Sequence, residues 1–233
     1  ANISPFSKFL LPSWLQKAAK LYGTIVRKII KKRLSYFFPM TTIEKYFSES
    51  SKTILSLKNF KKEINEIVES ILKCTKNKKK ILIAGNGGSC ADAEHFAGEL
   101  SCPFNKRDRK SFSAIPLTSH SAALTAWSND FGFESFFKRQ VNAHGNEDDI
   151  LFLLSTGGGN LTGSKTSANL VYAAEEGINK KMKIISLVGK GGGELQKISD
   201  ICINVESQNT AYIQEAHMSI LHCICEMLDN LKV

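Results

Sequence analysis

Short apolar runs that alternate with helical patterns dominate the last two thirds of this chain. Near-continuous apolar strands alternating with helices are typical of a parallel sheet that is covered on both faces. The sequence therefore predicts an α/β fold, a three-layer αβα sandwich with a five-stranded parallel sheet. The predicted strands are Ile81–Ala84, Ala114–Leu117, Ile150–Leu154, Lys183–Val188 and Ile201–Val205. The predicted helices cover about 91–100, 121–128 with 133–142, 166–176, 193–198 and 210–231.

Glycine and hydroxyl residues follow four of these strands. The turns are 85–89 (Gly-Asn-Gly-Gly-Ser), 118–121 (Thr-Ser-His-Ser), 155–159 (Ser-Thr-Gly-Gly-Gly) and 189–193 (Gly-Lys-Gly-Gly-Gly). Ligands of open α/β sheets bind outside the carboxyl ends of the strands. We therefore expect a binding site at this edge of the sheet.

The first and third of these turns have the chemistry of a phosphate cradle. A glycine turn that leads into a helix presents backbone N–H groups to an anion, and the hydroxyls of Ser155 and Thr156 suit the oxygens of a phosphate monoester. The sequence has no Walker lysine pattern, which disfavours a nucleoside triphosphate as the ligand. A dinucleotide fingerprint is incomplete, because Cys90 stands where its third glycine belongs and no acidic residue follows Leu117.

Two predicted helices carry side chains suited to acid/base or metal chemistry. His95 and Glu99 are four residues apart and share one helix face. Gln214 and His222 are eight residues apart, about 80° around the axis of the last helix. These four suit zinc, and they equally suit general acid/base catalysis without a metal. His217 is the alternative ligand on the same helix.

The positive charge of the chain is concentrated at its start. The net charge is +9, and residues 1–40 contain eight Lys or Arg and no Asp or Glu, so the remainder is nearly neutral. This distribution does not favour nucleic-acid binding by the body. Residues 1–39 read as an extension with a basic helical stretch over about 14–37. It is interpreted as a dispensable extension or leader, as a helix packing in an oligomer, or, least favoured, as a segment that contacts a membrane surface.

The rest of the chain, 41–233, reads as one domain: a helical region over 41–75, then an α/β core over 80–233. The six cysteines form no CxxC pair, which favours reduced thiols in a cytoplasmic protein. No stretch approaches the ~20 consecutive apolar residues of a membrane span.

Four ordered motifs resemble the sugar isomerase (SIS) domain family, and within it the phosphoheptose isomerases. They are 85–100 (GNGGSCADAEHFAGEL), 128–133 (SNDFGF), 154–157 (LSTG) and 213–222 (IQEAHMSILH). The resemblance covers about residues 41–233 and implies a flavodoxin-like SIS domain.

The resemblance implies an isomerase that converts sedoheptulose 7-phosphate to glycero-manno-heptose 7-phosphate for bacterial surface glycans. It implies that Glu99 and His222 transfer protons. It implies a homotetramer with sites shared between subunits. The zinc ligands that it implies are His95, Glu99, Gln214 and His222. The substrate-binding residues that it implies are Asn86, Gly87, Gly88, Ser89, Glu99, Asn129, Asp130, Ser155, Thr156, Gly157, Thr162 and Gln214.

The sequence departs from the family pattern in two places within this domain. The turn after the third strand, 155–164, is about three residues longer, so that either Thr162 or Ser164 would contact phosphate. Pro103 replaces an arginine often found shortly after the position of Glu99. These departures favour a changed sugar phosphate, and other aldose–ketose isomerases stay an alternative. A non-catalytic sugar-phosphate sensor or replication-initiator-binding protein is a further alternative, and the presence of Glu99 and His222 favours the enzyme.

Overall fold

The computed structural model describes residue 13 and residues 17–18, 20–28 and 40–231. The chain divides into two compact units, Ala1–Ser48 and Glu49–Val233, and each is described by itself. In the first unit, residues 20–28 are helical and expose the side chains of Leu21, Tyr22 and Ile25. The rest of the predicted helix over 14–37 falls largely outside the described residues. No helix in the described part of the chain is long and apolar enough to cross a membrane.

The helical region after residue 40 is not one continuous helix. It consists of α2 (Met40–Ser56), a 3-10 turn (Leu57–Phe60) and α3 (Lys61–Lys76). Apolar residues of α3 repeat at helical spacing and are buried, among them Ile64, Ile67 and Ile71. This part of the second unit therefore packs through one face of α3.

The sheet has five strands, all parallel, in the order β2-β1-β3-β4-β5. The predicted fold class is confirmed. The strands are β1 (Ile81–Gly85), β2 (Ala114–Pro116), β3 (Ile150–Leu154), β4 (Lys183–Gly189) and β5 (Ile201–Val205). Every residue of β1 and β3 is buried, as expected for central strands covered on both faces.

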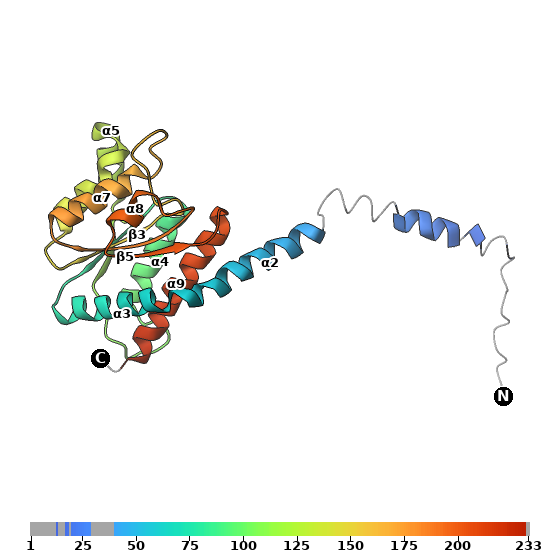
Figure 1. Cartoon of the computed structure of the whole chain (residues 1–233), viewed down its shortest axis with the longest axis horizontal. Helices are drawn as coiled ribbons and strands as arrows, with labels where there is room; N and C mark the ends of the chain where they lie inside the picture. The colour runs from blue at the N-terminus through green and yellow to red at the C-terminus, as the bar shows by residue number, and fades with distance from the viewer. Residues whose placement is uncertain (1–12, 14–16, 19, 29–39, 232–233) are drawn as a thin grey trace, which may run out of the picture. The chain divides into compact units, whose positions relative to one another are not determined.

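Successive residues of the strands enter two different apolar cores, as the alternation of side chains requires. Ile81 and Ile83 pack with α3, α4 (Gly88–Ser101) and α9 (Thr210–Asn230). Leu82 and Ala84 pack with α6 (Phe136–His144), α7 (Ala168–Asn179) and α8 (Gly193–Ile198). Figure 1 shows the strands between α7 and α8 on one side and α3 on the other. The remaining helical elements after β1 are α5 (Ser121–Phe131) and a 3-10 turn (Phe133–Ser135).

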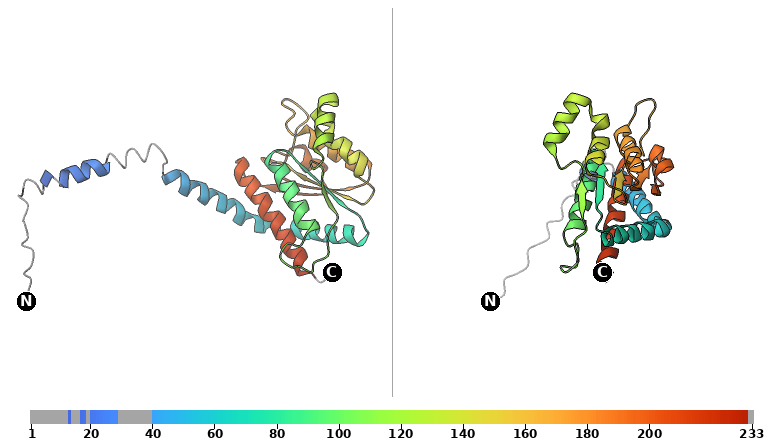
Figure 2. Two further views of the ribbon diagram at one scale, coloured as in Figure 1. Left: turned by 180° about the vertical axis from the view of Figure 1, so that it is seen from behind. Right: turned by 90° about the vertical axis from the view of Figure 1, so that its left-hand side faces the viewer.

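The strand order places a crevice between β1 and β3. From β1 the chain leads to β2 on one side, and from β3 it leads to β4 on the other, so the loops after these neighbouring strands separate. Helices α4 and α9 lie side by side next to this crevice (Figure 2, left). The two helices predicted to carry His95, Glu99, Gln214 and His222 are therefore neighbours.

Candidate active site

A pocket of about 270 Å³ lies at the carboxyl ends of β1 and β3. It holds most of the predicted substrate-binding residues. Its lining is Asn86, Gly87, Gly88, Ser89, Leu154, Ser155, Thr156, Ser167, Thr210 and Gln214. Thr210 and Ser167, at the starts of α9 and α7, add two hydroxyls that the sequence analysis did not single out. The pocket is thus lined by hydroxyls, amides and open backbone, which suits a phosphorylated polyol.

The turn after β1 depends on two glycines. A Cβ on Gly85 would lie 2.3 Å from the carbonyl oxygen of Ser89, so only glycine allows this tight reversal. Gly87 has φ +56°, a left-handed conformation that favours glycine. The turn leads directly into α4, which begins at Gly88, so Gly88 and Ser89 form the first turn of the helix. Their N–H groups are at the end of the helix where an anion is favoured.

Gly88 also makes room for Gln214. A Cβ on Gly88 would lie 2.0 Å from Nε2 of Gln214, so the amide side chain from α9 passes directly against the backbone of α4. Gln214 thereby reaches the pocket between the two helices.

The glycine-rich turns after β3 and β4 interlock. A Cβ on Gly158 would lie 1.8 Å from the carbonyl oxygen of Gly192. The N–H groups of Glu194 and Leu195, at the start of α8, donate to the carbonyls of Gly159 (3.0 Å) and Gly158 (2.9 Å). The turn after β4 therefore supports the turn after β3 and does not line the pocket.

Ser155 and Asn86 are already engaged inside the protein. Ser155 is buried and its Oγ accepts a hydrogen bond from the N–H of Gly158 (3.1 Å). The amides of Asn86 and Asn169 form a reciprocal pair, with N–O distances of 2.9 and 3.0 Å. Asn169, buried at the start of α7, was missed by the sequence analysis because nothing in its local pattern marks it. The pair joins the two loops on either side of the pocket.

The predicted proton-transfer residues come together across the seam between α4 and α9. Nε2 of His95 lies 2.9 Å from Nε2 of His222 and 3.6 Å from Oε1 of Glu99. His95 and Glu99 are partly exposed, so the cluster is open to a ligand. Phe104, in the loop after α4, stacks on the ring of His222 with centroids 5.7 Å apart. The sequence contains no signal for this contact, because Phe104 belongs to an irregular loop.

The donor set of this cluster fits zinc. Two imidazole nitrogens and a carboxylate oxygen are zinc ligands, and tetrahedral geometry with bonds near 2.0 Å places ligand atoms about 3.3 Å apart. The measured separations of 2.9 and 3.6 Å bracket that value. No group of three or more His, Cys, Asp or Glu in the described residues already has the arrangement of a metal site. The fit therefore rests on the kinds of donor and on the two distances from His95.

Four predicted substrate-binding residues lie elsewhere. Gly157 and Thr162 are exposed, outside the residues that line the pocket. Asn129 and Asp130 are exposed at the end of α5, where the Asn129 amide donates to the carboxylate of Asp130 (2.8 Å). Their assignment to the substrate stays a prediction.

The other histidines have structural positions. His217 is fully buried beneath the site, with Nε2 3.1 Å from the carbonyl oxygen of Val188. Burial lowers the pKa of His217 to about 4. Nδ1 of His120 accepts from the N–H of Ala123 and caps α5, and His144 ends α6.

One acidic residue next to the cluster was also missed. Asp92 lies one helical turn before His95 on α4, and its Oδ2 is buried with no hydrogen-bond partner in the described part of the chain. Burial raises the pKa of Asp92 to about 6, against the opposing influence of His95. Its place in a helix gave no sign of this burial.

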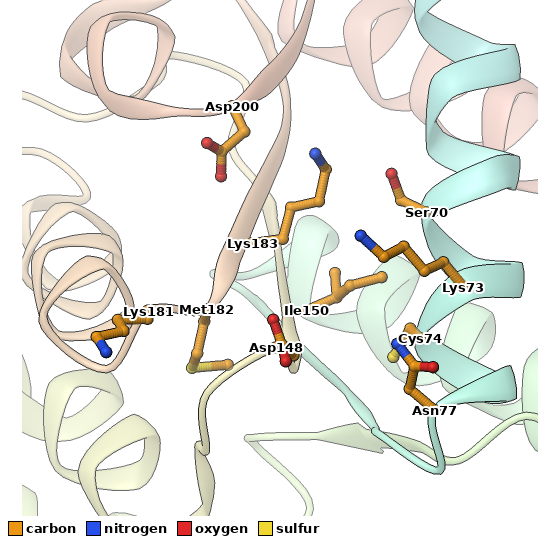
Figure 3. Close-up of a pocket in the computed structure, with 10 residues that line it drawn as sticks. All are labelled: Ser70, Lys73, Cys74, Asn77, Asp148, Ile150, Lys181, Met182, Lys183 and Asp200. Atoms are coloured by element: carbon orange, nitrogen blue, oxygen red, sulfur yellow. The ribbon is translucent and has the colours of Figure 1, made fainter.

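A pocket of similar size, about 290 Å³, lies at the opposite edge of the sheet. Figure 3 shows its side chains, with lysines from α3 and β4 and the carboxylates of Asp148 and Asp200. Ile150 and Lys183 in its lining are the first residues of β3 and β4, so this is the amino edge. It lacks the glycine turns and hydroxyl cluster of the first pocket.

Comparison with known proteins identifies relatives over most of the chain. The SIS domain family model matches residues 45–189. Phosphoheptose isomerase 1 of Campylobacter jejuni is 42% identical over 188 residues, which are 81% of this chain and 97% of that protein. Phosphoheptose isomerase of Helicobacter pylori (strain P12) is 40% identical over 175 residues, 75% of this chain and 87% of that protein.

Solved structures agree with these relatives. A phosphoheptose isomerase from Francisella tularensis is 36% identical, with a TM-score of 0.74, and the match covers 83% of this chain and 100% of that one. Phosphoheptose isomerase from Neisseria gonorrhoeae is 33% identical with a TM-score of 0.75, at the same coverage. The family model, over residues 45–189, includes the turns after β1 and β3 that line the pocket.

Proposed function

The chain belongs to the SIS domain family, among the phosphoheptose isomerases, and on that premise we propose that it converts sedoheptulose 7-phosphate to glycero-manno-heptose 7-phosphate. The observation that carries the proposal is the cluster of His95, Glu99 and His222 on two helices that flank the hydroxyl-lined pocket. The proposed compartment is the cytoplasm, and the proposed use of the product is surface-glycan synthesis.

The reaction needs two proton transfers that these residues can divide. Conversion of a ketose to an aldose removes a proton from C1, forms an enediol and returns a proton to C2. We assign the carboxylate of Glu99 to removal of the C1 proton. The imidazole of His222, on the facing helix, is assigned to proton transfer at the sugar oxygens or C2. Phe104 covers one face of the His222 ring and excludes water from it.

The phosphate is assigned to the pocket between the turns after β1 and β3. The first N–H groups of α4 and the hydroxyls of Thr156 and Ser167 are the donors available to its oxygens. Ser155 keeps the turn in shape, because its hydroxyl oxygen accepts the N–H of Gly158. The same hydroxyl still has its own proton to donate.

We include a zinc ion held by His95, Glu99, Gln214 and His222 in the proposal. When bound, the ion would supply a positive charge that stabilises the developing oxyanion of the enediol. The contact with Gly88 places the amide of Gln214 against α4, the helix that carries His95 and Glu99.

The proposed assembly is a homotetramer. Support comes from α2, which exposes large apolar side chains that a partner would cover. They are Ile43, Phe47, Ile54 and Leu55. Light scattering of the purified chain measures its mass in solution, and a monomer at micromolar concentration would contradict the tetramer.

The test of function is turnover of sedoheptulose 7-phosphate by the purified protein, after chelation and again after addition of zinc. We expect turnover that depends on zinc. Turnover that persists after chelation would contradict the role of zinc and would leave acid/base catalysis by Glu99 and His222 as the mechanism. Absence of turnover in folded, zinc-loaded protein would contradict the proposed reaction.

A further inference from the structure

The loop between α4 and β2 is fastened by a buried ion pair. Nε of Arg109, within this loop, lies 2.7 Å from Oδ1 of Asp229 near the end of α9. The two side chains are only 5% and 2% exposed. An ion pair this deeply buried gives little net stability compared with apolar packing, so stability alone does not account for its presence.

Arg109 holds the end of α4 that carries Glu99. Its Nη2 donates to the backbone carbonyls of Glu99 and Cys102. The carbonyls of a last helical turn have no partner within the helix, and a cation is favoured there. The guanidinium also lies over the ring of Phe112, 4.9 Å from its centroid. Arg109 therefore fixes the turn from which the Glu99 side chain projects.

Asp229 fixes the part of the loop that reaches His222. Its Oδ2 accepts hydrogen bonds from the N–H groups of Asn105 (2.6 Å) and Lys106 (2.8 Å). The residue just before them is Phe104, which stacks on the ring of His222. Asp229 lies two turns after His222 on α9, so one carboxylate ties the loop to the helix that carries this imidazole.

We propose that Arg109 and Asp229 are positioning residues for the reaction: their ion pair locks α4 to α9 and sets the placement of Glu99, His222 and Phe104. This inference rests on the proposed function, which assigns proton transfer to Glu99 and His222. Both members of the pair act through other residues and do not touch the substrate.

The chain contains a matched ion pair far from the site. Asp149 is 1% exposed, pairs with the ammonium of Lys80, and accepts from the N–H groups of Lys80 (3.0 Å) and Asn146 (2.8 Å). Like Asp229, it joins one cation and two backbone donors. It lies at the amino edge, immediately before β3. Loss of its charge measures the structural cost of breaking such a pair without disturbing the site.

The experiment compares Asp229→Asn with Asp149→Asn in the full chain, at a temperature where circular dichroism shows both folded. Activity is measured as kcat and KM, and inorganic phosphate is titrated as an inhibitor. We expect Asp229→Asn to lower kcat roughly 10- to 100-fold, the loss typical of misplaced catalytic groups. The phosphate inhibition constant should stay unchanged, because the phosphate pocket lies at the first turns of α4 and α9, whereas the ion pair holds their last turns. Asp149→Asn should lower the melting temperature and leave kcat within about twofold of the wild type.

A second readout does not depend on activity. The imidazole resonances of His222 in the metal-free protein report the ring current of Phe104, and Asp229→Asn should shift them while Asp149→Asn should not. Unshifted resonances, or equal kcat in the two variants, would overturn the inference. If the wild-type protein does not turn over sedoheptulose 7-phosphate, shifted resonances in Asp229→Asn would leave the positioning role intact and overturn the proposed reaction instead.

If Asp229→Asn does not fold, the same measurements are made on Arg109→Lys. Lysine keeps the charge opposite Asp229 but has one ammonium in place of the planar fork, so it cannot hold the carboxylate and both carbonyls together. We expect the same fall in kcat and the same shift at His222. A wild-type kcat and spectrum in folded Arg109→Lys would overturn the role of Arg109.

Discussion

The two edges of the sheet hold pockets of nearly equal volume and opposite chemistry. At the carboxyl edge, about 270 Å³ are lined by hydroxyls, amides and glycine backbone. At the amino edge, about 290 Å³ are lined by lysines and aspartates, and nearby charges pair with one another, as in Lys181 with Glu147 (3.2 Å). Pocket volume therefore does not distinguish the candidate site from the other edge. The hydrogen-bond donors that remain available to a ligand at the carboxyl edge do distinguish it.

The largest expected effect comes from Glu99→Gln at the carboxyl edge. The change keeps the volume of the side chain and removes the proposed base, so turnover should fall about 10²- to 10⁴-fold. Steady-state kinetics on folded protein measures this. Near-normal turnover would show that Glu99 does not take the proton.

The next effect comes from Gly88→Ala. The added Cβ would displace Gln214, whose Nε2 lies where the methyl group must go. We expect kcat/KM and zinc affinity to fall roughly 10- to 100-fold, as for other changes that reorient a ligand. Gly98→Ala is the matched control, because a Cβ on Gly98, in the same helix, meets nothing within 4 Å. Equal kinetics in the two variants would contradict the role of Gly88.

Acid should destabilise the protein through His217, beneath the carboxyl edge. Its pKa falls from the usual 6.5 to about 4 on burial, so the unfolded chain binds the proton more readily. The contribution of His217 to the free energy of unfolding is constant above pH 6.5. It is lost as the pH falls toward 4, by about 3 kcal/mol in total. Urea unfolding across this range measures the loss. His217→Gln should flatten the slope, and an unchanged slope would assign it to other groups.

The smallest effect is expected at the amino edge. Lys73→Ala and Lys183→Ala, together, remove two cations of the pocket in Figure 3. Both residues are exposed and remote from the turns after β1 and β3, so kcat and KM should stay within about twofold. A several-fold rise in KM would show that the amino edge takes part in substrate binding and would remove the contrast between the edges.

Sequence patterns predicted what local chemistry determines. The apolar runs located all five strands, with ends displaced by one residue at β1, β2 and β4. The helix spacing placed His95 and Glu99 on one face, and they do lie 3.6 Å apart. The single helical region predicted over 41–75 is interrupted at Leu57–Phe60, since apolar periodicity does not register a tighter turn.

Long-range contacts between irregular segments were not predictable in this way. Arg109 and Asp229 are 120 residues apart, and neither stands in a motif. The pairing of Asn86 with Asn169 likewise depends on how two loops meet. Such partners are chosen by tertiary geometry, and single residues in loops carry no periodic signal of it. The departure at Pro103 was visible in the sequence, whereas the ion pair of Arg109 and Asp229, which fastens the same loop, was not.

The interlocked turns after β3 and β4 have a consequence for how this protein can evolve. Gly158 and Gly192 approach so closely that a side chain on Gly158 requires the other backbone to move. A substitution at Gly158 is therefore expected to be tolerated only together with a change that moves the turn after β4. The outer part of the turn after β3, about 160–166, makes no such contact with the turn after β4, and Thr162 and Ser164 are exposed. Insertions there are therefore expected to leave the two interlocked turns, and the pocket beside them, in place.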